Sequence, residues 1–236
     1  MADRKQDILD AALSGFAEKG LAGTTVEEVR RRSGASVGSI YHHFGDKEGI
    51  AAALYVAALR DYQDGFLTVL DDGADAERTV KALVGHHLAW VAEDRDRAHF
   101  LLSGRPPRAA DGIAELNRRT FRATSEWLAG QVRAGHMQRV PFDVFYAVLI
   151  GPAQEFCRHW LEGRLRTSMR GAERTLAAAG VARAGRRLDI PDEGGLRWLR
   201  RSRRLGAGDC DGAVAEPGCF TTDAHRAAVG ELLAAP

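Results

Sequence analysis

The stretch from Ser33 to Gly49, SGASVGSIYHHFGDKEG, brings together side chains that could do several kinds of chemistry. The adjacent residues His42 and His43 could bind a metal ion or form a catalytic pair. The small polar residues that precede them could instead contact a nucleic acid. Adjacent residues on a helix point about 100° apart, so the two imidazoles cannot easily share one ion. We therefore expect no metal site here, and the nucleic-acid hypothesis gains weight.

Other candidate sites for metal binding or catalysis are weak. The pair His86-His87 meets the same geometric objection, and the widely spaced Cys210, Cys219 and His225 lack a fourth ligand. The letters GASVG suggest a nucleophile elbow, but they lie between two predicted helices, whereas an elbow joins a strand to a helix. The sequence thus predicts no catalytic residues, no metal and no cofactor, and we expect a protein that is not an enzyme.

Composition restricts the class of protein further. The chain has 236 residues and a net charge of +1, so any surface that binds nucleic acid must be a local patch. Three cysteines without a CxxC motif fit a reducing cytosol. No apolar run approaches the roughly 20 residues that span a bilayer, and MADRKQDILDAAL lacks the apolar core of a secretory signal. We expect a cytoplasmic protein without a membrane partner.

The first 20 residues predict an amphipathic helix that ends at Gly20, with Lys19 near its negative dipole end. Its apolar positions recur on one face and are Ile8, Leu9, Ala12, Leu13 and Phe16.

Three further helix starts follow within about 25 residues. Thr25 and Glu28 form a predicted capping box, and Gly34 ends that second helix. Ser36 is the predicted cap of a short helix, residues 37–44, and Asp46 that of a fourth helix beginning at residue 47. Short helices separated by a tight glycine turn indicate a helix-turn-helix.

Beyond this region longer amphipathic segments predict further helices, and no segment alternates with the period of a strand. The fold class is therefore all-α, with an N-terminal helix-turn-helix domain and a C-terminal helical bundle. Gly151-Pro152 should kink the apolar segment PFDVFYAVLIGPAQEFCRHWLEG, because Pro152 cannot donate its helical hydrogen bond. From about Arg164 the chain becomes rich in Arg and Gly, which favours a loosely attached tail.

The third helix has the composition that a major groove requires. The groove is about 12 Å wide, so the leading face of a helix that enters it needs small side chains. Gly38 lowers helix propensity by up to about 1 kcal/mol, so its presence asks for a reason such as close approach to DNA. The predicted contacts to bases or to the sugar-phosphate backbone are made by Thr25, Arg30, Ser36, Val37, Gly38, Ser39, Tyr41, His42 and Lys47.

The run TTVEEVRRRSGASVGSIYHHFGDKEGI resembles the DNA-binding motif of the tetracycline-repressor-like (TetR) family. The matching positions are Thr25, Val29, Gly34, Ser36, Gly38, Tyr41, His43, Phe44, Lys47 and Glu48, and the resemblance covers residues 4–64. Two positions depart from it. Gly15 replaces a large apolar residue, which should loosen the first helix. Arg30 replaces a small residue, and with Arg31 and Arg32 it makes the second helix basic, adding phosphate contacts.

The resemblance implies a homodimer that binds a double-stranded DNA operator and responds to a small-molecule effector. It divides the chain into a DNA-binding domain (4–64), a ligand-binding and dimerisation domain (65–180) and a tail (181–236). The best candidate for the dimer contact is the kinked apolar segment together with the helix that follows, around MRGAERTLAAAG. Candidates for the effector pocket are His87, Trp90, Phe100, Phe121, Trp127 and Phe156.

The function these patterns favour is a ligand-responsive transcriptional regulator, a repressor released from a pseudo-palindromic operator by a small molecule. Two alternatives stay open. An architectural DNA-binding protein without an effector would have an occluded C-terminal core, and a helical enzyme would use the helix-turn-helix only structurally.

Overall fold

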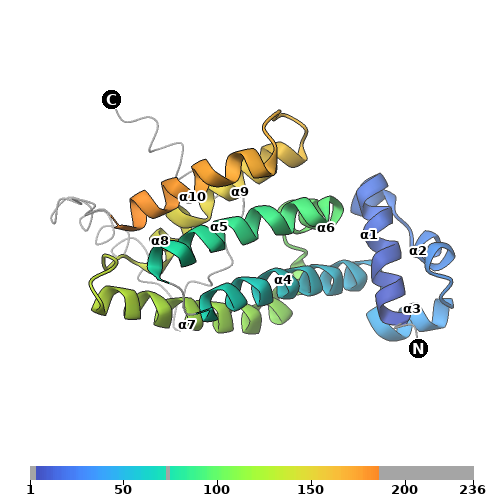
Figure 1. Cartoon of the computed structure of the whole chain (residues 1–236). Helices are drawn as coiled ribbons and strands as arrows, with labels where there is room; N and C mark the ends of the chain where they lie inside the picture. Colours follow the sequence, from blue (N-terminus) through green and yellow to red (C-terminus); the bar gives the residue numbers. More distant parts are fainter. Residues whose placement is uncertain (1–3, 73–74, 186–236) are drawn as a thin grey trace, which may run out of the picture.

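The computed structural model describes residues 4–72 and 75–185, which form an elongated, helical molecule (Figure 1). No strand occurs in these residues, and the predicted all-α class is confirmed. The elements are α1 (Arg4–Gly23), α2 (Val26–Ser33), α3 (Val37–Phe44), α4 (Lys47–Asp71), α5 (Ala76–Glu93), α6 (Arg95–Leu102), the 3-10 turn η1 (Pro107–Ala109), α7 (Ala110–Arg133), α8 (Phe142–Leu149), α9 (Gly151–Leu161) and α10 (Met169–Gly185).

Helices α1, α2 and α3 and the first two turns of α4 form a compact unit, residues 4–54, which we call the head. It lies at one end of the molecule in Figure 1. Its core is closed by apolar side chains from all four helices, among them Ile8, Leu9, Ala12, Phe16, Val29, Ile40, Phe44, Ile50 and Leu54. The predicted apolar face of the first helix is thus the face that α1 buries, with Leu13 at its edge.

The helix starts of the head follow its sequence closely because each has a side-chain cap. At Gly34 the backbone has φ 65° and ψ 10°, the left-handed conformation that glycine adopts without a steric penalty, and α2 ends there. The caps are Thr25, Ser36 and Asp46, whose side-chain oxygens accept hydrogen bonds from the backbone N–H groups of Glu28, Ser39 and Gly49 at 3.2, 3.1 and 2.8 Å.

The carboxylate of Glu28 does not complete the predicted capping box. It accepts instead from Lys19 Nζ at 2.8 Å and from Arg32 Nη2 at 2.7 Å. Arg32 also binds Glu18, and this guanidinium lowers the pKa of the Glu18 carboxyl to about 2. These ion pairs connect α2 to the C-terminal part of α1. The capping box does not form because the two basic side chains are stronger partners for the Glu28 carboxylate than a backbone N–H group.

The remaining helices form the C-terminal bundle, in which α5 packs against both α4 and α10. Helix α4 leaves the head and continues into this bundle without a break, so the predicted domain boundary at residue 64 falls inside it. The apolar segment predicted to kink at Gly151-Pro152 is divided there into α8 and α9, since α8 ends at Leu149 and α9 begins at Gly151.

Helix α10 continues through Gly185, past the predicted boundary at residue 180. Residues 186–236 of the predicted tail lie outside the described residues, and so do Cys210, Cys219 and His225. Among the helices that the structure describes, none combines the length and the apolar character needed to cross a bilayer.

Gly15 does not loosen α1, contrary to expectation, because the helix runs unbroken through it and Thr24 fills the space beside it. A Cβ at Gly15 would lie 2.8 Å from Thr24 Cγ2, and Thr24 is fully buried with its hydroxyl donating to the Gly20 carbonyl at 2.9 Å. A small residue is therefore required where Thr24 closes the head.

This contact predicts a change of sign between two backgrounds. Gly15→Ala should lower the free energy of unfolding by about 1–2 kcal/mol, because the clash outweighs the gain in helix propensity. In a Thr24→Ser background the clashing methyl group is gone, and the same change should stabilise by up to about 1 kcal/mol. Urea unfolding of the four proteins measures both values, and a stabilising Gly15→Ala in the parent chain would contradict the assignment.

Candidate DNA-binding surface and effector cavity

The outer face of α3 is exposed, and small residues lie at its start. Val37 and Tyr41 are 45% and 51% exposed, while Ile40 and Phe44, on the opposite face, are buried in the core of the head. Ser39 is half-buried, and its backbone N–H is held by the Ser36 hydroxyl. The helix is therefore fixed on its inner face and presents a slim outer face.

Gly38 leaves a bare patch of backbone on this face. The nearest atom to a Cβ built there is the Ser36 hydroxyl oxygen, 4.0 Å away. No contact with the described residues therefore requires glycine at this position. A partner that approaches the backbone closely, such as a groove wall, is the remaining physical reason for its cost in helix propensity.

Several residues predicted to contact DNA are engaged within the head. Thr25 and Ser36 cap their helices, and Lys47 Nζ donates to the Ala22 carbonyl at 3.4 Å. Arg30 binds Glu27 through two hydrogen bonds of 2.8 and 2.7 Å. Arg31 is exposed and makes no ion pair within the described residues.

Arg32 is held by Glu18 and Glu28, so a phosphate would have to compete with two carboxylates for this guanidinium. The prediction that all three arginines add phosphate contacts stays a prediction, with Arg30 and Arg32 each paired to glutamate in the free protein.

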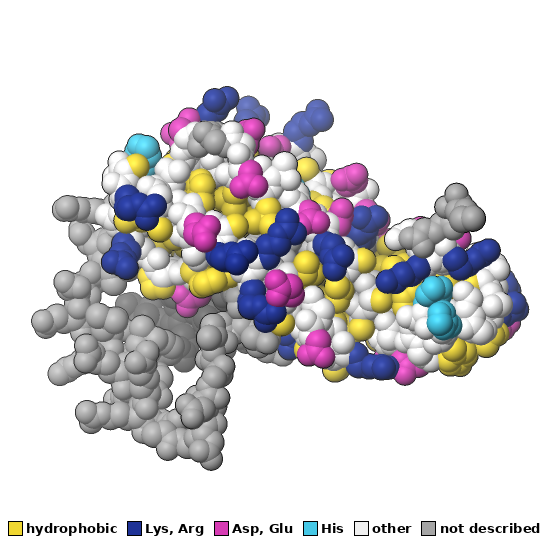
Figure 2. Space-filling model, turned by 90° about the horizontal axis from the view of Figure 1, so that it is seen from below, with side chains coloured by type: hydrophobic (Ala, Val, Ile, Leu, Met, Phe, Trp, Pro, Cys, Tyr) yellow, Lys and Arg dark blue, Asp and Glu magenta, His cyan; other side chains and the backbone are white. Residues whose placement is uncertain are grey.

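His42 and His43 are exposed. Figure 2 shows histidine side chains at the surface of the head, with lysine or arginine side chains nearby. Their ring centroids are 5.3 Å apart and their planes are inclined by 63°, so the rings meet edge to face. No group of three potential metal-binding side chains occurs in the parts of the chain that the structure describes.

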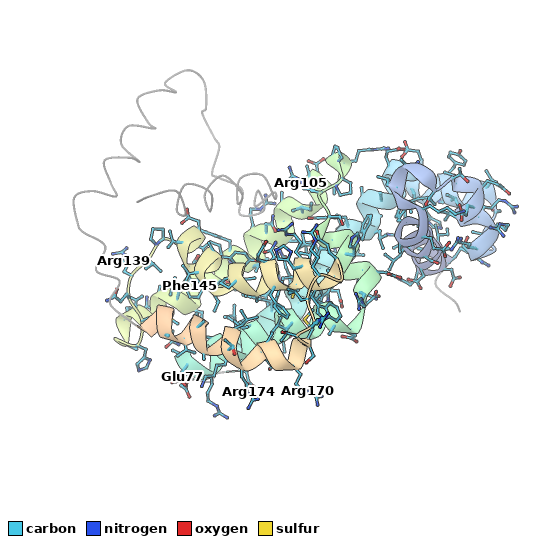
Figure 3. All side chains as sticks on the ribbon, turned by 90° about the horizontal axis from the view of Figure 1, so that it is seen from above. Glu77, Arg105, Arg139, Phe145, Arg170 and Arg174 are labelled. Atoms are coloured by element: carbon cyan, nitrogen blue, oxygen red, sulfur yellow. The ribbon has the colours of Figure 1, made fainter. Side chains whose placement is uncertain are left out.

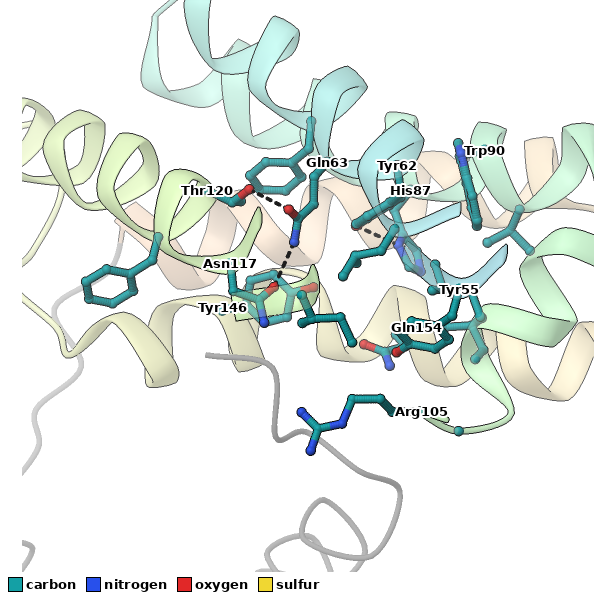
Figure 4. A pocket seen from close by; sticks show the side chains of 18 of the residues that line it. Tyr55, Tyr62, Gln63, His87, Trp90, Arg105, Asn117, Thr120, Tyr146 and Gln154 are labelled. Atoms are coloured by element: carbon teal, nitrogen blue, oxygen red, sulfur yellow. Dashed lines mark hydrogen bonds between the residues drawn. The ribbon is translucent and has the colours of Figure 1, made fainter. Parts of the chain in front are cut away.

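The C-terminal bundle contains a partly open cavity of about 370 Å³ (Figure 4), referred to below as the cavity. Side chains of α4, α5 and α7 and of the segment after α6 form most of its wall. The described lining residues are Tyr55, Leu59, Tyr62, Gln63, Phe66, His87, Trp90, Val91, Leu101, Leu102, Gly104, Arg105, Ile113, Asn117, Thr120, Phe121, Phe142, Tyr146 and Gln154.

A short chain of hydrogen bonds orders one side of the cavity. The Thr120 hydroxyl donates to Gln63 Oε1 at 2.9 Å, and Gln63 Nε2 donates to Asn117 Oδ1 at 3.0 Å (Figure 4). Gln63 and Asn117 are each only 7% exposed. Each amide orientation follows from its neighbour, so these side chains are fixed before any ligand enters.

A second set of lining residues, the aromatic side chains Tyr62, His87 and Trp90, is also held by hydrogen bonds. Tyr62 Oη lies 3.0 Å from His87 Nδ1, and Trp90 is anchored by its Nε1–H, which donates to Asp61 Oδ2 at 2.8 Å. His87 Nε2 has no hydrogen-bond partner among the described residues. Burial, and secondarily the neighbouring His86, lowers the pKa of His87 to about 4, so the imidazole is neutral at physiological pH.

The six predicted pocket residues divide into two groups. His87, Trp90 and Phe121 line the cavity. The other three do not: Phe100 stacks on Phe16 of the head at 5.6 Å, Trp127 packs near Phe145, and Phe156 lies against the core of the bundle. They are large aromatic side chains on amphipathic helices, and such periodicity cannot distinguish a packed core from a cavity wall.

The sequence analysis does not predict the polar part of the cavity wall, which is formed by Gln63, Asn117 and Thr120. Gln63 and Asn117 could have been found by one signal, because each amide lies among apolar neighbours on the buried face of its helix. A buried amide in that setting needs partners.

One segment touches both the cavity and the head. Leu101, Leu102, Gly104 and Arg105 line the cavity, and Phe100, directly before them, stacks on the head. Three residues further on, Arg108 Nη1 contacts both carboxylate oxygens of Asp46, at 2.5 and 2.6 Å. Asp46 is the cap of α4 and directly follows the C-terminal turn of α3, so residues 100–108 connect the cavity to the base of α3.

Comparison with known proteins identifies the head. Residues 8–54 match the family model of bacterial regulatory proteins of the tetR family. The head is a TetR-type N-terminal domain. The chain is 36% identical to the transcriptional repressor KstR2 of Rhodococcus jostii over 81 residues. The aligned region covers 34% of this chain and 40% of KstR2. The chain thus matches less than half the length of this relative.

Solved structures extend the likeness to the bundle. The fatty acid degradation regulator FadR of Bacillus halodurans superposes with a TM-score of 0.66 at 20% identity, over 77% of this chain and 96% of FadR. FadR of Bacillus subtilis, solved in complex with stearoyl-CoA, superposes with a TM-score of 0.65 at 18% identity, over 75% of this chain and 97% of that FadR. At these identities the likeness shows a shared fold: a TetR-type domain followed by a helical C-terminal domain.

The lowered pKa of His87 predicts a pH-dependent stability. Because the unfolded state, with a pKa near 6.5, binds the proton more tightly than the folded state, stability should fall as pH drops from about 6.5 to about 4. The loss attributable to His87 is on the order of 3 kcal/mol at the lower limit.

His87→Gln removes this titration while keeping a polar side chain beside Tyr62. Denaturant unfolding of both proteins at several pH values isolates the contribution, because all other groups cancel in the difference. A difference between the two proteins that does not change between pH 6.5 and pH 4 would show that His87 is accessible to protons in the folded state.

Proposed function

We propose that this chain is a ligand-responsive transcriptional repressor that acts as a homodimer on a pseudo-palindromic operator. The observation that carries the proposal is the outer face of α3 in a TetR-type domain: small, exposed and lacking a Cβ at Gly38. A cytoplasmic location follows from this role, since the operator is there.

On the DNA, Val37, Gly38 and Ser39 would approach base edges, while Tyr41 and His42 would reach the sugar-phosphate backbone. The positive dipole end of α3 would add an anchor for a phosphate. Thr25, Arg30, Ser36 and Lys47 keep a proposed role as contacts, and each also makes a hydrogen bond within the head.

The dimer would hold two copies of α3 about 34 Å apart, the separation of successive major grooves. We place its contact on α8 and α9, which form the kinked apolar segment, together with α10. Arg170 and Arg174 point away from the bundle along α10 (Figure 3), so charged groups would flank such a contact.

A small molecule in the cavity would release the DNA by favouring a different placement of the head. The residues 100–108 provide the connection, because they contact the cavity at Leu101 and Arg105 and the head at Phe16 and Asp46. A hundredfold change in operator affinity requires about 2.7 kcal/mol of differential ligand binding between the two states.

The two alternatives are less well supported. An architectural protein without an effector should have a filled core, whereas this bundle holds a cavity with fixed polar groups. For an enzyme, the described part of the cavity wall offers the neutral His87 beside the Tyr62 hydroxyl, and it includes no Asp, Glu, Ser, Cys or Lys side chain.

Gly38→Leu separates DNA binding from folding. The side chain meets open space in the free protein, so thermal stability should be unchanged or slightly higher, but it should collide with the groove and abolish operator binding. The operator is first obtained by selection of bound DNA from a random pool, and gel shifts then compare the variants.

Gly130→Leu is the matched control, because Gly130 is a helical glycine of α7 with one atom, Arg133 Nη2, at 4.0 Å from its virtual Cβ. It should bind the operator as the parent does. If the Gly38 variant retains full affinity, α3 does not enter the groove and the proposal fails; the same holds if selection yields no palindromic consensus.

Arg108→Gln should loosen the head without unfolding it. The ion pair with Asp46 is exposed, at 56% and 48%, and contributes little to global stability. Its loss should lower affinity for the selected operator several-fold and weaken discrimination against operators lengthened or shortened by one base pair. Asp46→Asn, which keeps the cap, should behave alike, and Arg118→Gln on α7 should have no effect. Unchanged spacing preference in both variants would contradict the connecting role.

A further inference from the structure

We propose that the cavity binds a medium-chain carboxylic acid as its anion, with an apolar body of roughly decanoate size. The proposal deepens the proposed function, on which its meaning as the effector rests, although binding itself can be tested without DNA.

Size sets the first limit. A water-sized group occupies about 30 Å³ in a condensed phase. The 370 Å³ of the cavity therefore hold roughly a dozen non-hydrogen atoms. Decanoate fits this number, and stearate exceeds it. The apolar part of the wall, contributed by residues such as Leu59, Phe66, Val91 and Ile113, suits an alkyl chain.

The direction of the hydrogen bonds sets the second limit. Because Gln63 donates to Asn117 Oδ1, the carbonyl side of the Asn117 amide is occupied and its Nδ2 donors point elsewhere. Asn117 makes no other hydrogen bond within the described part of the chain, and it is 7% exposed. Asn117 lines the cavity, so its amide N–H groups can donate to an acceptor of a ligand bound there, and a carboxylate oxygen is a strong acceptor.

Charge sets the third limit. Among the described residues of the wall, Arg105 is the one permanently charged side chain, and none is Asp or Glu. It contributes positive potential, which also bears on the neighbouring Tyr55, whose pKa burial raises and Arg105 lowers. An anion entering this cavity is favoured electrostatically and a cation is opposed.

Aromatic residues could instead form a cage for a quaternary ammonium group, but their arrangement argues against it. Such a cage offers open ring faces to the cation. Tyr62 packs face to face on His86 with centroids 5.3 Å apart, and Trp90 and His87 meet Tyr62 edge-on at 5.4 and 5.6 Å. These rings thus pack against one another and form an apolar part of the wall, so their faces are not open to a cation.

Isothermal titration calorimetry on the full-length protein tests the proposal with four probes of one chain length: decanoate, decanol, decyltrimethylammonium and decanoyl-CoA. We expect decanoate to bind most tightly, about tenfold or more over decanol, as one charge-assisted hydrogen bond provides. Stearate should bind more weakly than decanoate, since it exceeds the cavity.

Two variants assign the contacts. Asn117→Asp keeps an acceptor for Gln63 and should therefore fold, but its carboxylate should weaken decanoate binding at least tenfold while leaving decanol within about threefold. Arg105→Gln should weaken decanoate about tenfold and remove its advantage over decanol. Arg118→Gln, an exposed residue of α7 outside the cavity, is the control and should match the parent. Circular dichroism melting verifies that each variant is folded.

The outcomes separate the two proposals. Preference for decyltrimethylammonium, tighter binding of decanoyl-CoA, or equal binding of acid and alcohol would overturn the carboxylic acid. Decanoate binding in a protein that selects no operator would overturn the proposed function and leave the ligand class intact. Operator binding that no probe alters, with no heat of binding from decanoate, would overturn the ligand class alone.

Discussion

Helix α4 belongs to two hydrophobic cores at once, and this constrains how the molecule can move. Ile50 and Leu54 close the core of the head, whereas Tyr62 and Phe66 lie two to four turns further along in the core of the bundle. Because an α-helix is stiff over such a length, a displacement at its bundle end must appear at the head. Through the continuity of this one helix, the cavity of the bundle is linked mechanically to the head that carries α3.

Local interactions explain why the head was largely predictable. Caps, the glycine at the end of α2 and the apolar period each act within a few residues, so the sequence specifies α2 and α3 to the residue. The fate of Glu28 was not predictable in the same way, since Lys19 and Arg32 reach it only once α1 and α2 pack together. The capping-box motif predicts a backbone N–H group as the partner of Glu28, whereas the folded protein provides Lys19 and Arg32.

The bundle was predictable in class and not in detail, for a physical reason. Aromatic and aliphatic side chains at helical spacing fill a core or line a cavity equally well, and only packing distinguishes Phe121 from Phe156. The polar wall is more informative than the aromatic residues that drew attention in the sequence. Gln63, Asn117 and Thr120 form hydrogen bonds across two helices more than 50 residues apart, and no pattern in one segment reveals such a pairing.

The stacking of Phe100 on Phe16 and the bond from Arg108 to Asp46 mean that the head is completed by chain far downstream of it. A fragment that stops after α4 would expose an aromatic ring and leave the start of that helix without its arginine. Joining this head to another C-terminal domain therefore requires α6 and η1 to be transferred with it, because the residues that complete the head are discontinuous in sequence.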